Sequence, residues 1–460
     1  MEHKNKYFGT DGFRGEANLD LTALHAYKIG RFLGGYHGLH SGSKRIRIAV
    51  GKDTRRSSYM LEYALAAGIA SSGADAYMLH VITTPGVSYV TRTEGFDFGV
   101  MISASHNPYY DNGIKVVDRY GEKLSDEQAA LIEAYIDGDT ARLGLDGDLP
   151  HAKRDSIGRM IDWSAGRNRY VAYLISLAAN SFKSLRIGID CANGASWMIA
   201  RAVFEALGAE THVIGGEPSG TNINLACGST HTEALCELVR REHLDLGFAF
   251  DGDADRCIAV DENGHEVNGD HILYILACRL SERESLEGNT VAATVMSNSG
   301  LFRALEDVGI GCIQTAVGDR FVYEAMQKYG YSLGGEQSGH IIIKKYATTG
   351  DGILTAIMVA EQVLDKKTSL SKLARPVRFL PQVSVSVRVK SKSETVEDDG
   401  VRKALDEISR EIGKNGRILL RQSGTEPVIR VMVEFEEEAK CKHFADRMVK
   451  VIKERGLACE

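Results

Sequence analysis

Residues 45–51 carry the sequence RIRIAVG, a short run of apolar and β-branched residues that ends in glycine. Such a run is typical of a strand buried inside a sheet. A polar loop follows, and apolar residues then recur at helical spacing at Leu61, Leu65 and Ile69 before a second apolar run, AYML, at residues 76–79. This order of strand, helix and strand predicts a βαβ unit in a parallel or mixed sheet that helices cover on both faces.

The same order occurs twice more along the chain. Apolar runs at residues 185–190 (LRIGID) and 211–214 (THVI) flank one helical pattern, and runs at residues 290–296 (TVAATVM) and 311–313 (GCI) flank another. The units repeat one supersecondary arrangement, and this repetition does not require a common ancestor. We therefore expect successive α/β domains before the C-terminal part of the chain.

The C-terminal part has a different pattern. Residues 383–389 (VSVSVRV) alternate between apolar and polar positions, which is typical of a half-buried strand. A helical pattern, two further strand patterns and a charged helix at residues 436–454 follow, and together they predict an α+β module that begins near Pro376. The expected architecture is three successive α/β domains with mixed sheets and a C-terminal α+β domain around a central cleft, with bounds 1–157, 158–262, 263–375 and 376–460.

Composition and charge exclude several classes of protein. Of the 460 residues, 43% are hydrophobic and 25% are charged, as in ordinary folded chains, and seven prolines are too few for a proline-rich linker protein. The formal net charge of −7 argues against a broadly basic surface for nucleic acid. No apolar run approaches the ~18 residues of a membrane span, and the N-terminus lacks the apolar segment of a secretory signal.

The eight cysteines form no Cys-x-x-Cys pair. Scattered cysteines in a long chain without a secretory signal are typical of reduced thiols. We therefore expect a cytoplasmic protein without a zinc site or disulfides, and without nucleic-acid or membrane partners.

The most distinctive motif is SASHNP at residues 103–108, directly after the apolar strand pattern of residues 98–102. It brings two serines into a polar loop, where Pro108 prevents a continuing helix. A serine hydroxyl is a weak nucleophile unless a base or a cation assists it, and His106 and Lys115 lie close in the sequence. The motif predicts either a nucleophilic serine or a turn-rich loop whose side chains cap backbone groups.

A second motif, DGDADR at residues 251–256, places carboxylates at alternate positions between two strand-like segments. Three carboxylates on a tight loop can converge on one hard cation and leave coordination positions for a substrate oxygen. Glu262 occupies the twelfth position of an EF-hand loop, but Arg256 stands at the sixth, which requires glycine, so an EF-hand is excluded. A solvated acidic turn remains the alternative to a metal site.

Two further polar loops are suited to a polar ligand. GGEQSGH at residues 334–340 combines Glu and Ser side chains with glycines, which suits recognition of hydroxyl groups or an amine. RQSGTEPVIR at residues 421–430 combines backbone amides around a glycine with hydroxyls and arginines, which favours phosphate binding without the spacing of a P-loop.

Two N-terminal segments add cations. FGTDGFRG at residues 8–15 contains Arg14 between glycines, and GKDTRRSS at residues 51–58 has three cations between a strand and a helix, where anions bind favourably. Arginines in such loops can instead tether domains through carboxylates. Because ligands bind at the strand ends of α/β sheets, five polar loops that each end a strand favour a ligand site.

With these motifs in this order, the chain resembles the α-D-phosphohexomutase family over essentially its whole length. SASHNP resembles the phosphoserine loop of that family and places the phosphorylated residue at Ser105 rather than Ser103. DGDADR resembles the magnesium loop, GEQSGH the sugar-specificity loop, and RQSGTEP the loop that holds the distal phosphate of the substrate.

The sequence departs from the family pattern at two positions. Ala254 replaces a glycine that many members carry, and Gln337 stands where phosphomannomutase/phosphoglucomutase members often have methionine. The Glu-Gln-Ser form, together with residues 296–298 (MSN) and 317–320 (VGDR), is similar to the glucosamine-specific branch of the family.

The resemblance implies an intramolecular phosphotransferase of the isomerase class. It would interconvert glucosamine 6-phosphate and glucosamine 1-phosphate through a phosphoserine and a 1,6-bisphosphate intermediate, and its product would feed amino-sugar nucleotide and cell-wall synthesis. The implied cofactor is Mg²⁺, and the implied activator is a hexose 1,6-bisphosphate. The expected partner is a small-molecule sugar phosphate, and a homodimer is the candidate assembly. Lys115 is the first candidate for assisting proton transfer at the sugar hydroxyl.

The same resemblance implies three groups of site residues. They are Ser105 (modified as phosphoserine), Lys115, Arg14, His106, Arg256 and His340 for catalysis; Ser105, Asp251, Asp253 and Asp255 for the metal; and Glu336, Ser338, Arg421, Ser423, Gly424, Thr425 and Arg430 for the substrate.

Three alternatives remain open. The same chemistry on mannose or glucose phosphates would make the chain a phosphomannomutase/phosphoglucomutase. A non-catalytic protein could bind phosphosugars on the same scaffold. A metal-dependent phosphatase with a serine nucleophile would release free phosphate in place of an isomer.

Overall fold

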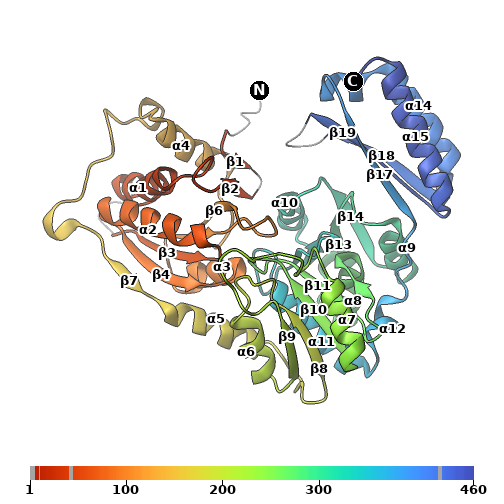
Figure 1. The fold of residues 1–460 in the computed structure, drawn as a ribbon, viewed down its shortest axis with the longest axis horizontal. Helices are drawn as coiled ribbons and strands as arrows, with labels where there is room; N and C mark the ends of the chain where they lie inside the picture. The colour runs from red at the N-terminus through yellow and green to blue at the C-terminus, as the bar shows by residue number, and fades with distance from the viewer. Residues whose placement is uncertain (1–5, 10, 41–44, 423–426, 460) are drawn as a thin grey trace. The chain divides into compact units, whose positions relative to one another are not determined.

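The computed structural model describes residues 6–9, 11–40, 45–422 and 427–459 (Figure 1). The chain divides into two compact units. The first comprises Met1–Met296 with Ile310–Arg375, and the second comprises Ser297–Gly309 with Pro376–Glu460. The domain bounds predicted from the sequence at residues 157, 262 and 375, and the central cleft, stay predictions.

The N-terminal sheet of the first unit has the strand order β1-β2-β6-β5-β3-β4-β7. Strand β3 pairs in parallel with β4 and β5, and β6 pairs antiparallel with β5 and β2, so the sheet is mixed. Its elements are β1 (Phe8–Gly9), β2 (Gly12–Glu16), α1 (Ala23–His40), β3 (Arg47–Lys52), α2 (Arg56–Ser71), β4 (Asp75–Val81), α3 (Thr84–Thr93), β5 (Phe98–Ile102), β6 (Asp111–Asp118), α4 (Asp126–Asp137) and β7 (Met160–Asp162).

Two more sheets follow in the first unit. Their strand orders are β12-β11-β10-β8-β9 and β14-β13-β15-β16, and both are mixed because β11 and β16 run antiparallel to their neighbours. The elements are α5 (Ser164–Ser176), β8 (Arg186–Asp190), α6 (Ile199–Ala206), β9 (Glu210–Ile214), α7 (Glu233–Glu242), β10 (Leu246–Phe250), β11 (Cys257–Val260), β12 (Glu266–Val267), α8 (Gly269–Glu282), β13 (Thr290–Thr294), β14 (Gly311–Thr315), α10 (Asp319–Tyr329), β15 (Leu333–Gly335), β16 (Ile341–Ile343), α11 (Gly352–Lys366) and α12 (Leu370–Ala374).

The three predicted βαβ units are confirmed. In each, the two predicted strands pair in parallel: β3 with β4, β8 with β9, and β13 with β14. Strands β5 and β10 are buried along their whole length, as expected for strands in the interior of a covered sheet. The polar motifs SASHNP, DGDADR and EQSGH directly follow β5, β10 and β15, each of which has a parallel neighbour. These loops therefore lie at carboxyl ends of strands, where α/β folds bind ligands.

The second unit contains the predicted α+β module. Strands β17 (Gln382–Arg388), β19 (Val428–Phe435) and β18 (Gly416–Gln422) form an antiparallel sheet in that order, and apolar residues of α14 (Asp399–Ile412) and α15 (Glu438–Glu454) pack with it. Among the described residues, this unit also contains the α-helices α9 (Ser299–Asp307) and α13 (Lys392–Glu397). The fold class predicted from the sequence, α/β domains followed by an α+β domain, is confirmed.

Helix α9 groups with the C-terminal sheet through one buried acid. The backbone N–H and the hydroxyl of Ser299 donate to Glu434 Oε2 at 3.0 and 2.5 Å, and Arg417 Nε donates to the same oxygen at 2.8 Å. Glu434 is fully buried, so these donors offset the cost of removing its charge from water.

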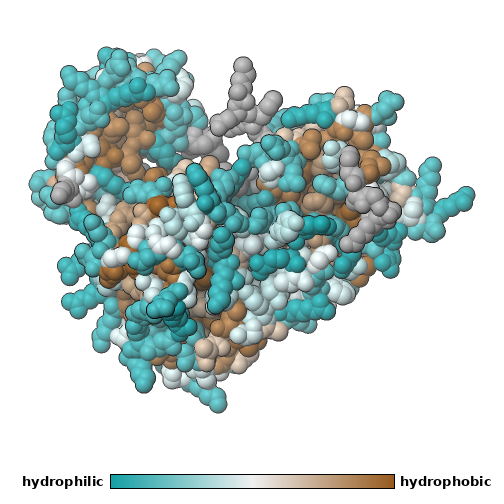
Figure 2. All heavy atoms as spheres, turned by 180° about the vertical axis from the view of Figure 1, so that it is seen from behind, coloured by the Kyte–Doolittle hydropathy of each residue, from teal (hydrophilic) through white to brown (hydrophobic). Residues whose placement is uncertain are grey.

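None of the helices within the described ranges is long and apolar enough to cross a lipid bilayer. Hydrophilic residues cover most of the face seen in Figure 2.

Candidate active site

The serine loop meets the acidic loop in the first unit. Ser105 Oγ donates to Asp251 Oδ2 at 2.5 Å, although 146 positions separate the two residues, and each is only 1% exposed. The family resemblance implied that Ser105 and the three aspartates hold one metal ion, and the structure brings the two loops together. A hydroxyl beside a carboxylate cluster is a place where a phosphoryl group and a cation can meet.

Ser105 has a backbone φ of 54°, in the left-handed region that non-glycine residues seldom adopt. The other serine of the motif supports this conformation. Ser103 Oγ accepts from Ser105 N at 3.0 Å and donates to Asp53 Oδ2 at 2.7 Å. Because Ser103 is fully buried and engaged at both ends, it is a structural partner, and Ser105 is the serine that faces the acidic loop.

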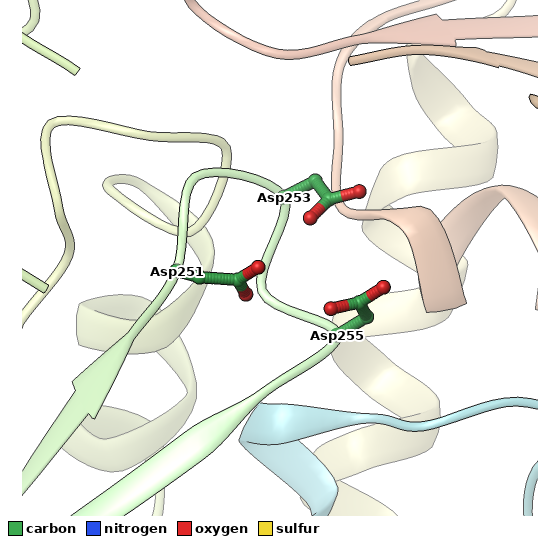
Figure 3. Close-up of side chains that lie close together, drawn as sticks. All are labelled: Asp251, Asp253 and Asp255. Carbon is green, nitrogen blue, oxygen red and sulfur yellow. The ribbon is translucent and has the colours of Figure 1, made fainter. Parts of the chain in front are cut away.

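Asp251, Asp253 and Asp255 lie on the loop between β10 and β11, and Figure 3 shows their carboxylates around a common space. One oxygen from each lies within 4.8 Å of the others, and all three residues are buried. Burial and the charges of Asp255 and Asp253 raise the pKa of Asp251 well above its ordinary value. Among the described residues, Asp253 Oδ1 and Asp255 Oδ1 are buried without a hydrogen-bond partner. This donor set fits a divalent cation that prefers oxygen ligands, such as Mg²⁺.

Lys115, on β6, faces the acidic loop. Its Nζ donates to Asp253 Oδ2 at 2.8 Å and lies 2.9 Å from Asp11 Oδ2 and 3.5 Å from Asp255 Oδ2. Burial alone would lower the pKa of Lys115, but the three carboxylates outweigh it and raise the pKa above its ordinary value. In this arrangement the side chain is a buried positive charge directed at the site.

His106 lies beside the serine, with Nδ1 3.4 Å from Ser105 Oγ. Burial and the positive charges of Arg256 and Arg14 lower the pKa of His106 to about 4. The imidazole is therefore neutral at physiological pH and can exchange a hydrogen bond with the hydroxyl.

The two arginines predicted for catalysis lie in the same cluster. Arg14 donates to Asp11, and the Arg256 backbone N–H donates to Asp251 Oδ1 at 3.2 Å. Arg256 Nε lies 3.9 Å from Asp255 Oδ1. Both guanidinium groups therefore lie among the acids that surround Ser105.

His340 approaches the acidic loop from the start of β16. Its Nδ1 lies 3.7 Å from Asp255 Oδ2, and its Nε2 lies 3.4 Å from Asp319 Oδ2. Burial would lower the pKa of His340, but Asp319 and Asp255 raise it to about 9. The Gly350 N–H donates to Nε2 at 3.0 Å and favours the neutral ring, so opposing contacts act on the protonation state of this histidine.

Asp11, Lys123 and Asp319 also belong to this charge cluster, although the sequence motifs did not identify them as site residues. Lys123 Nζ donates to Asp11 Oδ1 at 2.6 Å and to Asp319 Oδ2 at 2.5 Å, so it connects the N-terminal loop with the first turn of α10. Asp11 and Asp319 stand inside motifs already quoted, FGTDGFRG and VGDR, which is a signal that could have identified them. Lys123 follows an ordinary turn and carries no such signal.

The loop that carries Glu336 and Ser338 lies against the start of β11, directly after the acidic loop. A Cβ added at Gly339, whose φ is 91°, would lie 2.3 Å from the Cys257 carbonyl oxygen, so only glycine permits this approach. The Cys257 N–H also donates to the Gly339 carbonyl at 3.0 Å. Glu336 Oε1 accepts from Gly318 N at 3.1 Å, and Ser338 is exposed.

The predicted phosphate loop is in the second unit. Arg421 on β18 and Arg430 on β19 are paired directly across the two strands, so their side chains share one face of that sheet. The predicted residues Ser423, Gly424 and Thr425 lie outside the described residues.

Models of four domain families match the chain. They are described as phosphoglucomutase/phosphomannomutase alpha/beta/alpha domains I, II and III and C-terminal domain, and they match residues 5–142, 168–264, 268–378 and 385–451.

Curated relatives match over nearly the full length. The phosphoglucosamine mutase of Lachnospira eligens is 56% identical over 453 residues, covering 98% of this chain and 99% of that protein. The phosphoglucosamine mutase of Bacillus subtilis is 47% identical over 453 residues with the same coverage.

Solved structures share the fold. A phosphoglucomutase/phosphomannomutase family protein from Burkholderia thailandensis has a TM-score of 0.81 at 23% identity, covering 98% of both chains. The Aspergillus fumigatus N-acetylphosphoglucosamine mutase in complex with GlcNAc-6P and magnesium has a TM-score of 0.70 at 17% identity, covering 98% of this chain and 96% of that one. The family resemblance that the sequence motifs indicated is thus confirmed. The chain belongs to the phosphoglucomutase/phosphomannomutase family.

Proposed function

We propose that the chain interconverts glucosamine 6-phosphate and glucosamine 1-phosphate, the activity for which its curated relatives are named. The observation that carries the mechanism is the contact between Ser105 Oγ and the acidic loop. A serine that is buried, held in a left-handed conformation and directed at three carboxylates is suited to carry a phosphoryl group beside a cation.

In the proposed reaction, phosphorylated Ser105 transfers its phosphoryl group to the free hydroxyl of the sugar phosphate. The bond between Ser105 Oγ and phosphorus breaks, a new sugar O–P bond forms, and the sugar becomes a 1,6-bisphosphate. After the bisphosphate turns round, Ser105 takes the other phosphoryl group and the isomeric monophosphate leaves. The serine is phosphorylated again at the end, so a trace of bisphosphate suffices to activate the enzyme.

We propose Mg²⁺ as the cation, with Asp251, Asp253, Asp255 and the oxygen at Ser105 as its ligands. When bound, it would neutralise negative charge on the transferring phosphoryl group. Lys115, Arg14 and Arg256 add fixed positive charge around the same group.

Proton transfer needs a group near the sugar hydroxyl. Lys115 is a buried cation between three carboxylates, which suits it to stabilise charge, to donate its proton to the departing oxygen and then to take up the proton that the sugar hydroxyl releases. His340 bridges Asp255 and Asp319 and is the second candidate for moving that proton.

Substrate recognition is assigned to two loops. Glu336 and Ser338 would contact sugar hydroxyls or the amine, and Arg421 and Arg430 with Ser423, Gly424 and Thr425 would hold the phosphate that is not reacting. Because the sugar binds in two orientations, this phosphate site must accept a phosphate on C6 and one on C1. A cytoplasmic location and a homodimer remain part of the same proposal.

A coupled assay with glucosamine 6-phosphate, Mg²⁺ and a trace of glucose 1,6-bisphosphate tests the proposal. We expect glucosamine 1-phosphate to form from glucosamine 6-phosphate. Its formation should be faster than that of the 1-phosphates from mannose 6-phosphate and glucose 6-phosphate. Faster turnover of either hexose phosphate would transfer the assignment to that substrate. Release of free phosphate would indicate a phosphatase, and binding without turnover a phosphosugar-binding protein.

A further inference from the structure

Two carbonyl oxygens of the serine loop share the same pair of donors. The Ser105 carbonyl accepts from Arg55 Nη2 at 2.8 Å and from Asn224 Nδ2 at 2.9 Å. The Asn107 carbonyl accepts from the same two nitrogens at 2.9 and 3.1 Å. Arg55 precedes α2 beside the N-terminal sheet, whereas Asn224 lies between β9 and α7 beside the sheet that carries the acidic loop.

Arg55 is fully buried and directs both terminal nitrogens of its guanidinium at backbone carbonyls of residues 105–111. Its Nη1 donates to the carbonyls of Pro108 and Asp111, and its Nε donates to Asp53 Oδ2 at 2.7 Å. Asp53 is also fully buried. A buried charge is costly unless it is paired. Asp53 pairs with Arg55, and backbone carbonyls of residues 105–111 accept from the other nitrogens of Arg55.

The acidic loop itself packs on the Ser105 carbonyl. A Cβ added at Gly252 would lie 2.5 Å from that oxygen, so the two loops approach each other more closely than a side chain would allow. The carbonyl of Ser105 therefore accepts hydrogen bonds from Arg55 and Asn224 and lies against Gly252 of the acidic loop. A left-handed conformation at Ser105 needs support from its surroundings, and these contacts from outside the loop add to the support that Ser103 gives from within it.

We propose that Arg55 and Asn224 are positioning residues that hold the Ser105 peptide against the acidic loop. Through Ser105 they set where the phosphoryl group lies relative to the carboxylates, and neither side chain needs to touch the sugar. The inference rests on the proposed role of Ser105 as phosphoryl carrier. A displacement of about 1 Å in a reacting group can cost about 100-fold in rate, so loss of one donor should reduce turnover more than binding.

The substitution Asn224→Gly isolates this contact. Asn224 has a φ of 57°, which glycine adopts without strain, so the change removes Nδ2 and leaves the backbone free to keep its conformation. Asn18→Gly is the matched control, because Asn18 also has a positive φ, 68°, but is exposed and makes no contact with the serine loop among the contacts described here.

We expect Asn224→Gly to lower kcat and the single-turnover rate of Ser105 phosphorylation by glucose 1,6-bisphosphate at least 10-fold, with KM changed less than threefold and the Asn18→Gly enzyme unchanged. Arg55→Lys, which keeps the charge but cannot reach all the carbonyls, should slow the same step. Rates within twofold of the unsubstituted enzyme in Asn224→Gly, or a raised KM with unchanged kcat, would overturn the proposal.

Hydrogen exchange of the peptide that spans residues 98–113 supplies a readout without turnover. Faster exchange at residues 103–108 in Asn224→Gly, and not in Asn18→Gly, is expected whatever reaction the enzyme performs. If the unsubstituted enzyme isomerises no sugar phosphate, the proposed function fails while this exchange measurement still decides the positioning role. Unchanged exchange at residues 103–108 in Asn224→Gly would refute the positioning role.

Discussion

Replacing Asp351 with asparagine should stabilise the protein at neutral pH and destabilise it in acid. Asp351 caps the N-terminus of α11, where its Oδ1 accepts from Leu354 N at 3.0 Å and its Oδ2 accepts from Tyr170 OH at 2.8 Å. The next residue, Gly352, donates its N–H to the Ala254 carbonyl at 3.0 Å, so this helix end supports the acidic loop. The carboxylate is 2% exposed and has no cation among the partners described here.

The size and sign of the effect follow from the pKa. Burial raises the pKa of Asp351 from 3.8 to about 6, although the Leu354 N–H and Tyr170 act in the opposite direction. The folded protein therefore binds this proton more tightly than the unfolded chain does. The protonated Asp351 side chain therefore contributes favourably to the free energy of unfolding below about pH 4, and this contribution is lost as pH rises through about 6. At ~1.4 kcal/mol per pKa unit, the loss amounts to about 3 kcal/mol.

Asparagine keeps the oxygen that accepts from Leu354 and removes the charge. Its amide cannot accept the Tyr170 hydroxyl proton, and losing that hydrogen bond costs about 1 kcal/mol. At pH 7.5 the Asp351→Asn protein should therefore be more stable by about 2 kcal/mol, and near pH 4 it should be less stable by about 1 kcal/mol. Thermal unfolding of both proteins in buffers between pH 4 and 7.5 measures the change in this difference.

Asp398→Asn is the matched control, because Asp398 also caps a helix and accepts from Val401 N at 3.0 Å. The Arg455 side chain and that N–H lower the pKa of Asp398, so its ionised form is the stabilising one. The control variant should lose stability throughout pH 4 to 7.5, and it should recover relative to the unsubstituted protein only below about pH 4, as pH falls through the lowered pKa of Asp398. A difference between Asp351→Asn and the unsubstituted protein that stays constant from pH 4 to 7.5 would show that Asp351 ionises normally and that the reasoning from burial is wrong.

Three predictions concern the reaction. Ser105→Ala should abolish turnover and remove the phosphopeptide from mass spectra of the purified protein, whereas phosphate found on Ser103 would contradict the assignment. Asp253→Asn should leave the circular dichroism spectrum nearly unchanged and raise the Mg²⁺ concentration needed for half-maximal activity at least 10-fold, since one of three buried carboxylates is lost; an unchanged requirement would argue against a ligand role. Arg421→Ala should raise KM at least 10-fold with little change in the Mg²⁺ requirement, and a normal KM would remove Arg421 from the substrate site.

Local patterns in the sequence determined the elements and the motif loops. Apolar periodicity in residues 45–79 reports a strand, a helix and a second strand because side-chain burial repeats within a few residues. The motifs SASHNP and DGDADR could be identified without coordinates because each places its chemistry on one short loop. Their convergence could be predicted only through the family resemblance, since 146 positions separate Ser105 from Asp251.

The tertiary structure alone decided which other residues join the site. Lys123 has an ordinary sequence context, and it becomes part of the charge cluster because the fold places Asp11 and Asp319 on either side of it. The family resemblance selected Ser105 over Ser103, and the tertiary contacts give the physical difference, because Ser103 donates to Asp53 whereas Ser105 faces the acidic loop. Arg55 is a third example. Its position after a strand predicts an anion site, but in the structure the side chain is fully buried and donates to backbone carbonyls. Electrostatic and hydrogen-bond partners are set by distance in space, and the sequence records only distance along the chain.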